Sequence, residues 1–281
     1  MAITSLNRFL FALAALVPAT ALPAVAQPVS GTNAPPWLIS NGETGAEIYV
    51  PRDIEKLYER GTRSRNGSPG PNYWQNEAAH KIKLTLAPPN KRVQGEQEII
   101  YTNNSPDTLP LLIFRLYMNA HQPEALRELP TSRDFMTSGM TVEEFSIDGK
   151  TVPWNDPASP LGSINFPGST MHGIVLPTPL ASKASVSIKM RWSYDLVRDK
   201  GWKEGALDEN SFFLAYFFPR VTNYSDDGGW DSKLFTMGRE FNNDFADFEV
   251  EVVSPRDYVV WATGELQNAA EVLRPKIVAS L

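Results

Sequence analysis

The histidines are the first side chains to consider for metal or acid–base chemistry. His80, His121 and His172 lie far apart in the sequence, and no two have the i, i+4 spacing that places two ligands on one helix face. The chain has no cysteine, so it has neither thiolate ligands nor a cysteine nucleophile. No Gly-x-Ser-x-Gly elbow occurs either. We predict no metal site and no catalytic residue, while three histidines meeting in space, or a Ser-His-Asp triad, stay open as alternatives.

A second candidate is an acidic, glycine-containing segment. Its carboxylates are Asp226, Asp227, Asp231, Glu240, Asp244 and Asp247. Two carboxylates at a suitable separation could hydrolyse a glycosidic bond, and aspartate-rich loops can hold calcium through oxygen ligands. The spacing matches no EF-hand loop. Solvated turns are the simplest interpretation, and an edge that faces a ligand or another domain is the next.

Aromatic residues are dense between Trp192 and Phe245, with runs at residues 212–213 and 216–218. The cores of β-sandwiches use aromatic side chains heavily, so core packing is the first interpretation. The alternative is a docking surface, because tyrosine and tryptophan combine an apolar body with a polar tip.

The elements that carry these residues are predominantly strands. Residues 82–86 and 186–194 alternate apolar with polar side chains, and 111–118 is nearly continuously apolar, as in a buried strand. Asp148-Gly149 predicts a tight hairpin turn. Residues 248–252 alternate again, Ser254-Pro255 turns the chain, and 258–262 is expected to return as a strand. With no long amphipathic helix between them, these strands predict an all-β, antiparallel β-sandwich.

The segments before the sandwich have a different composition. Residues 27–71 are rich in Pro, Gly, Ser and Asn and predict an extended arm, with one short helix at 53–60. Residues 1–26 carry Arg8, then an apolar run at 9–17, then a small-x-small pattern ending at Ala26. This series predicts a signal peptide cleaved after Ala26, since the run is too short to cross a bilayer. We expect a periplasmic or secreted protein without a membrane segment after cleavage.

The overall composition limits the possible partners. The chain has 281 residues, of which 42% are hydrophobic, so a substantial core is possible. The net charge of −6 does not indicate a nucleic-acid surface, which needs clustered Lys and Arg.

Four blocks of sequence together resemble a known family. They are residues 70–76 (GPNYWQN), 212–230 (FFLAYFFPRVTNYSDDGGW), 238–255 (GREFNNDFADFEVEVVSP) and 262–266 (ATGEL). In this order they resemble the amino-terminal domain of bacterial exported members of the aminopeptidase N family of zinc metallopeptidases. The resemblance covers roughly residues 70–268, and its motifs are specific as a set and weak one at a time.

The resemblance implies a saddle-shaped β-sandwich over residues 72–266, followed by a truncated linker or tail over 267–281. In the family a thermolysin-like catalytic domain follows, whose Gly-x-Met-Glu-Asn and His-Glu-x-x-His motifs bind substrate and zinc. This sequence contains neither motif, so zinc would belong to that other domain and none is expected here.

The resemblance also implies an edge that faces the catalytic domain. Tyr216 occupies or neighbours the position at which family members place a Gln or Glu that helps to bind the substrate's free amine. Tyrosine can line a subsite there but cannot act as a carboxylate. The candidates for the interdomain edge are Phe217, Arg220, Tyr224, Trp230 and Glu240.

Three functions remain in consideration. The favoured one is a non-catalytic front domain that walls the substrate cleft, docks a catalytic domain, and by itself binds peptides weakly at most. The alternative is a free-standing periplasmic binding or scaffolding sandwich. The third is a self-sufficient hydrolase that uses the acidic segment.

Overall fold

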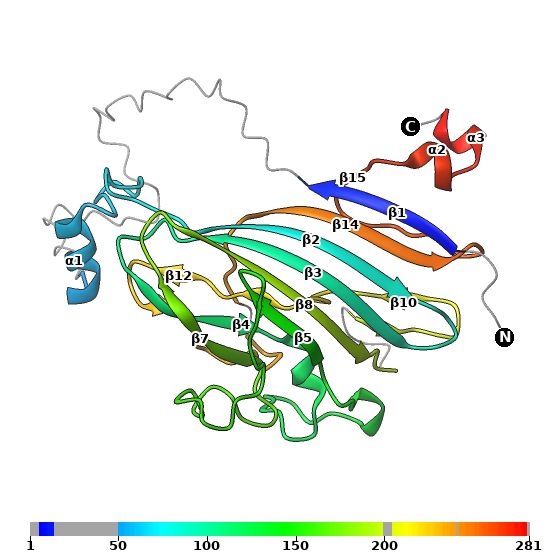
Figure 1. Ribbon diagram of the computed structural model, residues 1–281, viewed down its shortest axis with the longest axis horizontal. Coiled ribbons are helices and arrows are strands. Elements are labelled where there is room, and N and C mark those ends of the chain that lie inside the picture. Colours follow the sequence, from blue (N-terminus) through cyan, green and yellow to red (C-terminus); the bar gives the residue numbers. More distant parts are fainter. Residues whose placement is uncertain (1–5, 14–49, 199–203, 240, 280–281) are drawn as a thin grey trace, which may run out of the picture. The chain divides into compact units, whose positions relative to one another are not determined.

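The computed structural model describes residues 6–13, 50–198, 204–239 and 241–279 (Figure 1). The chain forms two compact units, one of residues 16–73 and one that combines residues 1–15 with 74–281. Within the described ranges, no helix is long and apolar enough to cross a membrane.

The described part of the smaller unit is a capped helix followed by a turn. Helix α1 (Arg52–Arg60) confirms the short helix expected at 53–60. It ends at Gly61, whose φ of 71° is the left-handed conformation that lets an amide reach back to the last carbonyls. The Thr62 amide closes the same cap by donating to the Leu57 carbonyl at 3.1 Å. Of the expected extended arm, residues 27–49 lie outside the described residues.

The larger unit is built on an eight-stranded sheet in the order β15-β1-β14-β2-β3-β8-β5-β6 (Figure 1). The strands in that order are β15 (Glu265–Leu266), β1 (Leu6–Leu13), β14 (Ala246–Pro255), β2 (Glu77–Leu86), β3 (Arg92–Thr102), β8 (Ser185–Asp195), β5 (Thr141–Ile147) and β6 (Lys150–Thr151). Every pairing is antiparallel except that of β14 with β2. A parallel neighbour needs a long crossover, and β14 comes late in the chain, far from β2.

The remaining elements are short. A three-stranded sheet has the order β11-β4-β7, and two small hairpins are β9–β10 and β12–β13. Their bounds are β4 (Leu109–Arg115), β7 (Met171–Leu180), β9 (Gly205–Ala206), β10 (Phe212–Phe213), β11 (Arg220–Val221), β12 (Tyr224–Ser225) and β13 (Gly229–Trp230). The helical pieces are the 3₁₀ turns η1 (Tyr117–His121) and η2 (Arg133–Phe135) and the one-turn helices α2 (Ala269–Val272) and α3 (Pro275–Val278).

The core lies between the large sheet and the three-stranded sheet. On β2, side chains alternate so that Ile82, Leu84 and Leu86 are buried, as the sequence pattern predicts. They belong to one apolar cluster with side chains of the opposing sheet such as Leu112 and Phe114. The expected all-β sandwich is therefore confirmed. The Asp148-Gly149 turn is also confirmed, since both residues have the positive φ, 49° and 75°, that a tight hairpin requires.

Two apolar segments do not form continuous strands, and for residues 258–262 this makes the expected return strand wrong. Residues 212–218 do not form one strand, because only Phe212–Phe213 pairs and Tyr216 has a φ of 54°, which no strand residue adopts. Residues 258–262 do not return as a strand beside β14. That edge of β14 is occupied by β1, from Leu6 opposite Pro255 to Leu13 opposite Phe248 (Figure 1). Strand β1 lies in the segment predicted to be a signal peptide, whose predicted cleavage site at Ala26 is outside the described residues.

The close contact of Gly95 with Trp192 gives a stability prediction. A Cβ added at Gly95 would lie 2.1 Å from Trp192 Cζ2, inside a core where the indole is fully buried. We expect Gly95→Ala to lower the free energy of unfolding by about 1–3 kcal/mol, as overpacking does. Chemical denaturation of the parent and the variant measures this change in the free energy of unfolding. Gly228→Ala is the matched control, since nothing lies within 4 Å of its added Cβ, and an equal loss there would contradict the prediction.

Candidate functional site

The site begins with a cluster of four aromatic rings around Tyr216. Tyr117 lies 4.9 Å from Tyr216 and 4.4 Å from Phe241, measured between ring centroids. Phe235 contacts all three, at 5.2–6.0 Å. Tyr117 and Phe235 are buried, whereas Tyr216 and Phe241 are half-buried. The cluster thus reaches from the core to the surface.

Tyr216 holds a backbone conformation that costs free energy. Its φ of 54° lies in the left-handed region, where a bulky side chain is rare and the cost is of order 1–3 kcal/mol. The contacts of its ring with three aromatic neighbours hold this conformation. Strain of this kind concentrates at binding and catalytic sites, which makes Tyr216 a candidate on structural grounds as well.

Two arginines lie beside the aromatic cluster, directly opposite each other on β4 and β11. Arg115 is paired in register with Arg220. Arg115 is 1% exposed, donates to Asp231 Oδ2 at 2.9 Å and to the Lys233 carbonyl at 2.7 Å, and lies over the Phe241 ring. Arg220 donates to the Asp244 carbonyl at 3.0 Å. Among the described residues, the Nε of each guanidinium has no hydrogen-bond partner.

Burial sets the electrostatics of this region. It raises the pKa of Asp244 from 3.8 to about 6, although the positive charge of Arg220 opposes the shift. It raises the pKa of Tyr117 to about 12, so this phenol is neutral and donates to Asn243 Oδ1 at 3.2 Å. Burial also lowers the pKa of Arg220. At neutral pH the Tyr117 phenol therefore keeps its proton, and Asp244 is the group in this region that ionises near pH 6.

The predicted edge residues separate into different clusters. Phe217 turns inward toward Trp192, with ring centroids 6.3 Å apart. Tyr224 and Trp230 pair across the β12–β13 hairpin, and Tyr224 also stacks on Trp74. Of the predicted interdomain residues that the structure describes, Arg220 alone joins the region around Tyr216. Glu240 lies outside the described residues.

The three histidines do not meet. His80 accepts from the Gln97 amide at 3.0 Å, and burial, with a smaller effect of Arg220, lowers its pKa to about 3. His121 contacts Glu204 Oε1 at 2.9 Å, and His172 contacts the Trp154 carbonyl at 2.8 Å. Within the described ranges, no group of three His, Asp or Glu side chains could hold a metal ion.

The acidic segment is dispersed as well. Asp231 pairs with Arg115, Asp244 accepts from Asn223 at 2.7 Å, and Asp227 accepts from Ser225. Asp247 is an exposed residue of β14. The segment therefore contributes single contacts in separate places.

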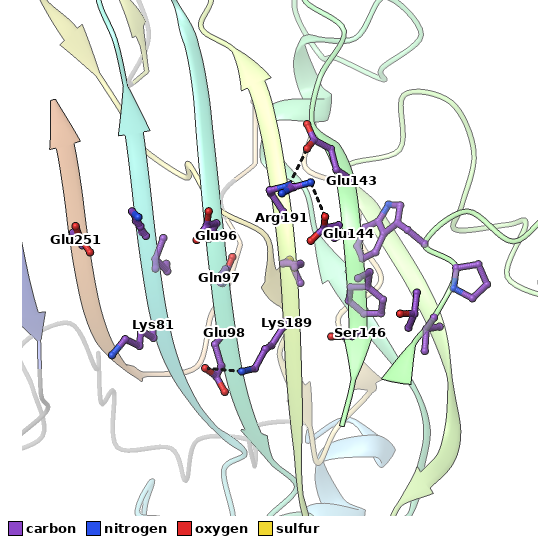
Figure 2. A pocket seen from close by; sticks show the side chains of 18 of the residues that line it. Lys81, Glu96, Gln97, Glu98, Glu143, Glu144, Ser146, Lys189, Arg191 and Glu251 are labelled. Atoms are coloured by element: carbon purple, nitrogen blue, oxygen red, sulfur yellow. Dashed lines mark hydrogen bonds and ion pairs between the residues drawn. The ribbon is translucent and has the colours of Figure 1, made fainter. Parts of the chain in front are cut away.

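The outer face of the large sheet contains a hollow of about 820 Å³ lined mainly by charged side chains (Figure 2). The sign of the charge alternates from strand to strand. One row across the sheet runs Glu249, Lys81, Glu98, Lys189, and a second runs Glu251, Lys83, Glu96, Arg191, Glu144. In the first row, Lys81 forms an ion pair with Glu249 at 2.9 Å, and Lys189 forms one with Glu98 at 3.5 Å.

A bulge in β5 adds to this charge pairing. The register shifts between Val142 and Glu144, so that Glu143 and Glu144 are both exposed. Both bind Arg191, at 3.1 and 2.6 Å (Figure 2). The charged side chains that line the hollow thus largely pair with one another across the strands. The aromatic cluster with its two arginines is therefore the stronger candidate for a functional site.

Comparison with known proteins gives partial structural similarity. No protein-family model matches the chain, and no curated protein matches it. Among solved structures it is similar to the M1 zinc metallopeptidase of Deinococcus radiodurans, with a TM-score of 0.37 and 14% identity over 70% of this chain and 36% of that one. A mutant of that enzyme bound to a Tyr-Ser-Ala substrate gives a TM-score of 0.35 and 13% identity, over 72% and 39%. The chain spans less than two fifths of the length of these proteins.

The Asp244 carboxyl gives a pH prediction. Because its folded pKa is raised above the unfolded value, its contribution to stability is fully present below pH 3.8 and is lost as the pH rises through about 6. Asp244→Asn cannot ionise and keeps an oxygen that can accept from Asn223. We expect the melting temperature of the variant, relative to the parent, to rise between pH about 4 and about 7.

The matched control is Asp227→Asn, which changes an exposed carboxylate of the same segment. Thermal melts of the three proteins across that pH range measure the effect. A difference between Asp244→Asn and the parent that stays constant with pH would contradict the prediction.

Proposed function

We propose that this chain is an exported, non-catalytic front domain of a zinc aminopeptidase-like protein. In this role the region around Tyr216 walls one side of a peptide cleft and docks against a catalytic domain. The whole protein would remove N-terminal residues from peptides with zinc held by that other domain. Export with loss of residues 1–26, and a periplasmic or secreted location, are parts of the same proposal.

The observation that carries the proposal is the incomplete burial of the aromatic segment that contains Tyr216. Between Phe212 and Arg220, only Pro219 is fully buried, and Phe213 is 54% exposed. Phe245, which follows Asp244, is 84% exposed. Apolar surface that a chain leaves exposed next to rigid, partly polar groups is typical of an interaction surface. The sequence resemblance assigns this edge to the catalytic domain.

The chemistry of the edge suits a positioning role. Tyr216 carries a half-buried phenol, and Arg220 on β11 brings a half-buried guanidinium to the same region, where the buried Arg115 opposite it is already paired with Asp231. Phenol and guanidinium groups bind carbonyls and carboxylates of a peptide or of a partner domain. None of these groups supplies the Lewis acid or the metal-bound water that peptide hydrolysis in this family requires.

The test has two parts. The first is to read the gene beyond codon 281, where the proposal expects a frame that encodes Gly-x-Met-Glu-Asn and His-Glu-x-x-His. The second is to express both the chain to residue 281 and the longer chain, and to assay aminoacyl-nitroanilides with zinc. We expect chelator-sensitive turnover from the longer chain only. In that longer chain, Tyr216→Ala should raise KM more than it lowers kcat.

The outcomes separate the candidate functions. Zinc-dependent turnover by the chain to residue 281 would overturn the non-catalytic assignment. A gene without those motifs would favour the free-standing binding or scaffolding sandwich. A longer chain in which Tyr216→Ala leaves KM unchanged would remove Tyr216 from the cleft.

A further inference from the structure

Strand β1 pairs with one edge of β14 and, on its other side, bonds to the segment around β15. The Leu10 amide donates to Asn268 Oδ1 at 3.1 Å, and the Gln267 amide donates to the Leu10 carbonyl at 2.9 Å. The backbone groups of Leu10 therefore face away from β14. Because backbone direction alternates along a strand, those of Phe9 and Phe11 face β14, opposite Val252 and Val250.

A second segment of the chain could pair with the same edge. Residues 258–262 have the composition of a strand, yet none of them is in one. Trp261 is 91% exposed and Val259 is 65% exposed. The turn that would start a hairpin is already closed, since the Tyr258 amide donates to the Pro255 carbonyl at 3.0 Å. Four-residue hairpin loops are commonly built around such a turn.

The register of that hairpin follows from the turn. With residues 255–258 as the loop, Ser254 lies opposite Val259, and Val252 lies opposite Trp261. Directly opposed residues of antiparallel strands project on the same face. Trp261 would therefore lie on the face of Val252, where Val250 and Phe248 pack against the core but stay only partly buried. The exposed Trp261 would thereby cover a part of the core that is only partly buried.

We propose that residues 6–13 and residues 258–263 compete for one edge of β14. While the leader is attached, β1 holds the edge and 258–263 stays unpaired with it. When residues 1–26 are removed, 258–263 closes onto β14 as a hairpin strand. In both states the edge of β14 is paired, whereas an open edge would be a site of aggregation. This inference depends on the predicted leader and is independent of the proposed peptidase role.

Cysteine trapping tests the exchange, because the chain has no cysteine of its own. In the hairpin, Glu251 and Ala262 are directly opposite in a pair whose backbone groups do not bond to each other. Their Cα atoms would be about 4.5 Å apart, within the range for a disulfide. The full chain carrying Glu251→Cys and Ala262→Cys is compared with the same chain carrying also Phe9→Pro and Phe11→Pro. The prolines remove the amides that bond β14.

We expect loss of free thiol on mild oxidation in the proline variant and retention of free thiol in the chain without prolines. The matched control is Glu251→Cys with Thr263→Cys, one residue out of register, whose side chains project on opposite faces and should stay reduced in both backgrounds. Equal oxidation with and without the prolines, or oxidation of the control pair, would overturn the proposal.

Hydrogen exchange on the unsubstituted full chain gives a second measurement that does not depend on the proline variant folding. Amides of Val259, Trp261 and Thr263, which would face β14 in this register, should be protected after a leader peptidase removes residues 1–26 and unprotected before. Equal protection before and after removal would also overturn the competition between the two segments.

Discussion

The segment that carries Tyr216 depends on a single buried amide, that of Gln97. This side chain is 4% exposed and makes three hydrogen bonds to three different parts of the fold. Its oxygen accepts from the Trp192 indole on β8 at 3.1 Å, and its nitrogen reaches His80 Nδ1 on β2 and the Pro219 carbonyl, both at 3.0 Å. A buried amide left without partners would cost free energy, so all three partners are held together by the same requirement.

The state of His80 completes this arrangement. Because burial lowers its pKa to about 3, the imidazole is neutral and Nδ1 can accept the second hydrogen of the Gln97 amide. The ring stacks on Phe248 of β14 at 4.9 Å. One buried polar group thus connects β2, β3, β8 and the loop before β11, and it fixes where Arg220 enters beside Arg115.

Local sequence patterns predicted the parts of the fold that local physics determines. The period-2 alternation of residues 82–86 and 186–194 predicted β2 and β8, and Asp148-Gly149 predicted a turn with two positive φ values. The parallel pairing of β14 with β2 joins distant segments, and nothing in either strand specifies its partner. The prediction of a return strand at 258–262 was wrong because β1 pairs with that edge of β14 instead. A local sequence pattern cannot show which of two segments will pair with the same edge.

The candidate site could likewise be predicted only in part, because local sequence patterns do not show which distant residues come together. Tyr216 and Arg220 were named from the family resemblance, but Phe217, Tyr224 and Trp230 lie in other clusters because neighbouring residues of an irregular segment point in different directions. Arg115 was missed, although a charge inside the apolar run 111–118 was the available signal. A buried arginine needs a carboxylate partner, and Asp231 in the acidic segment is that partner.

Neither face of the large sheet offers an apolar surface for docking. The outer face alternates acidic and basic strands, so that its charges satisfy one another across β14, β2, β3, β8 and β5 and the face stays hydrated. The inner face is filled by the core around Trp192. What remains is the aromatic segment that ends at Arg220, whose aromatic side chains are only partly buried, and the edge of β14, which β1 occupies. A partner domain gains most by burying the apolar side chains of the aromatic segment, whereas another strand can use the edge of β14 only by displacing β1.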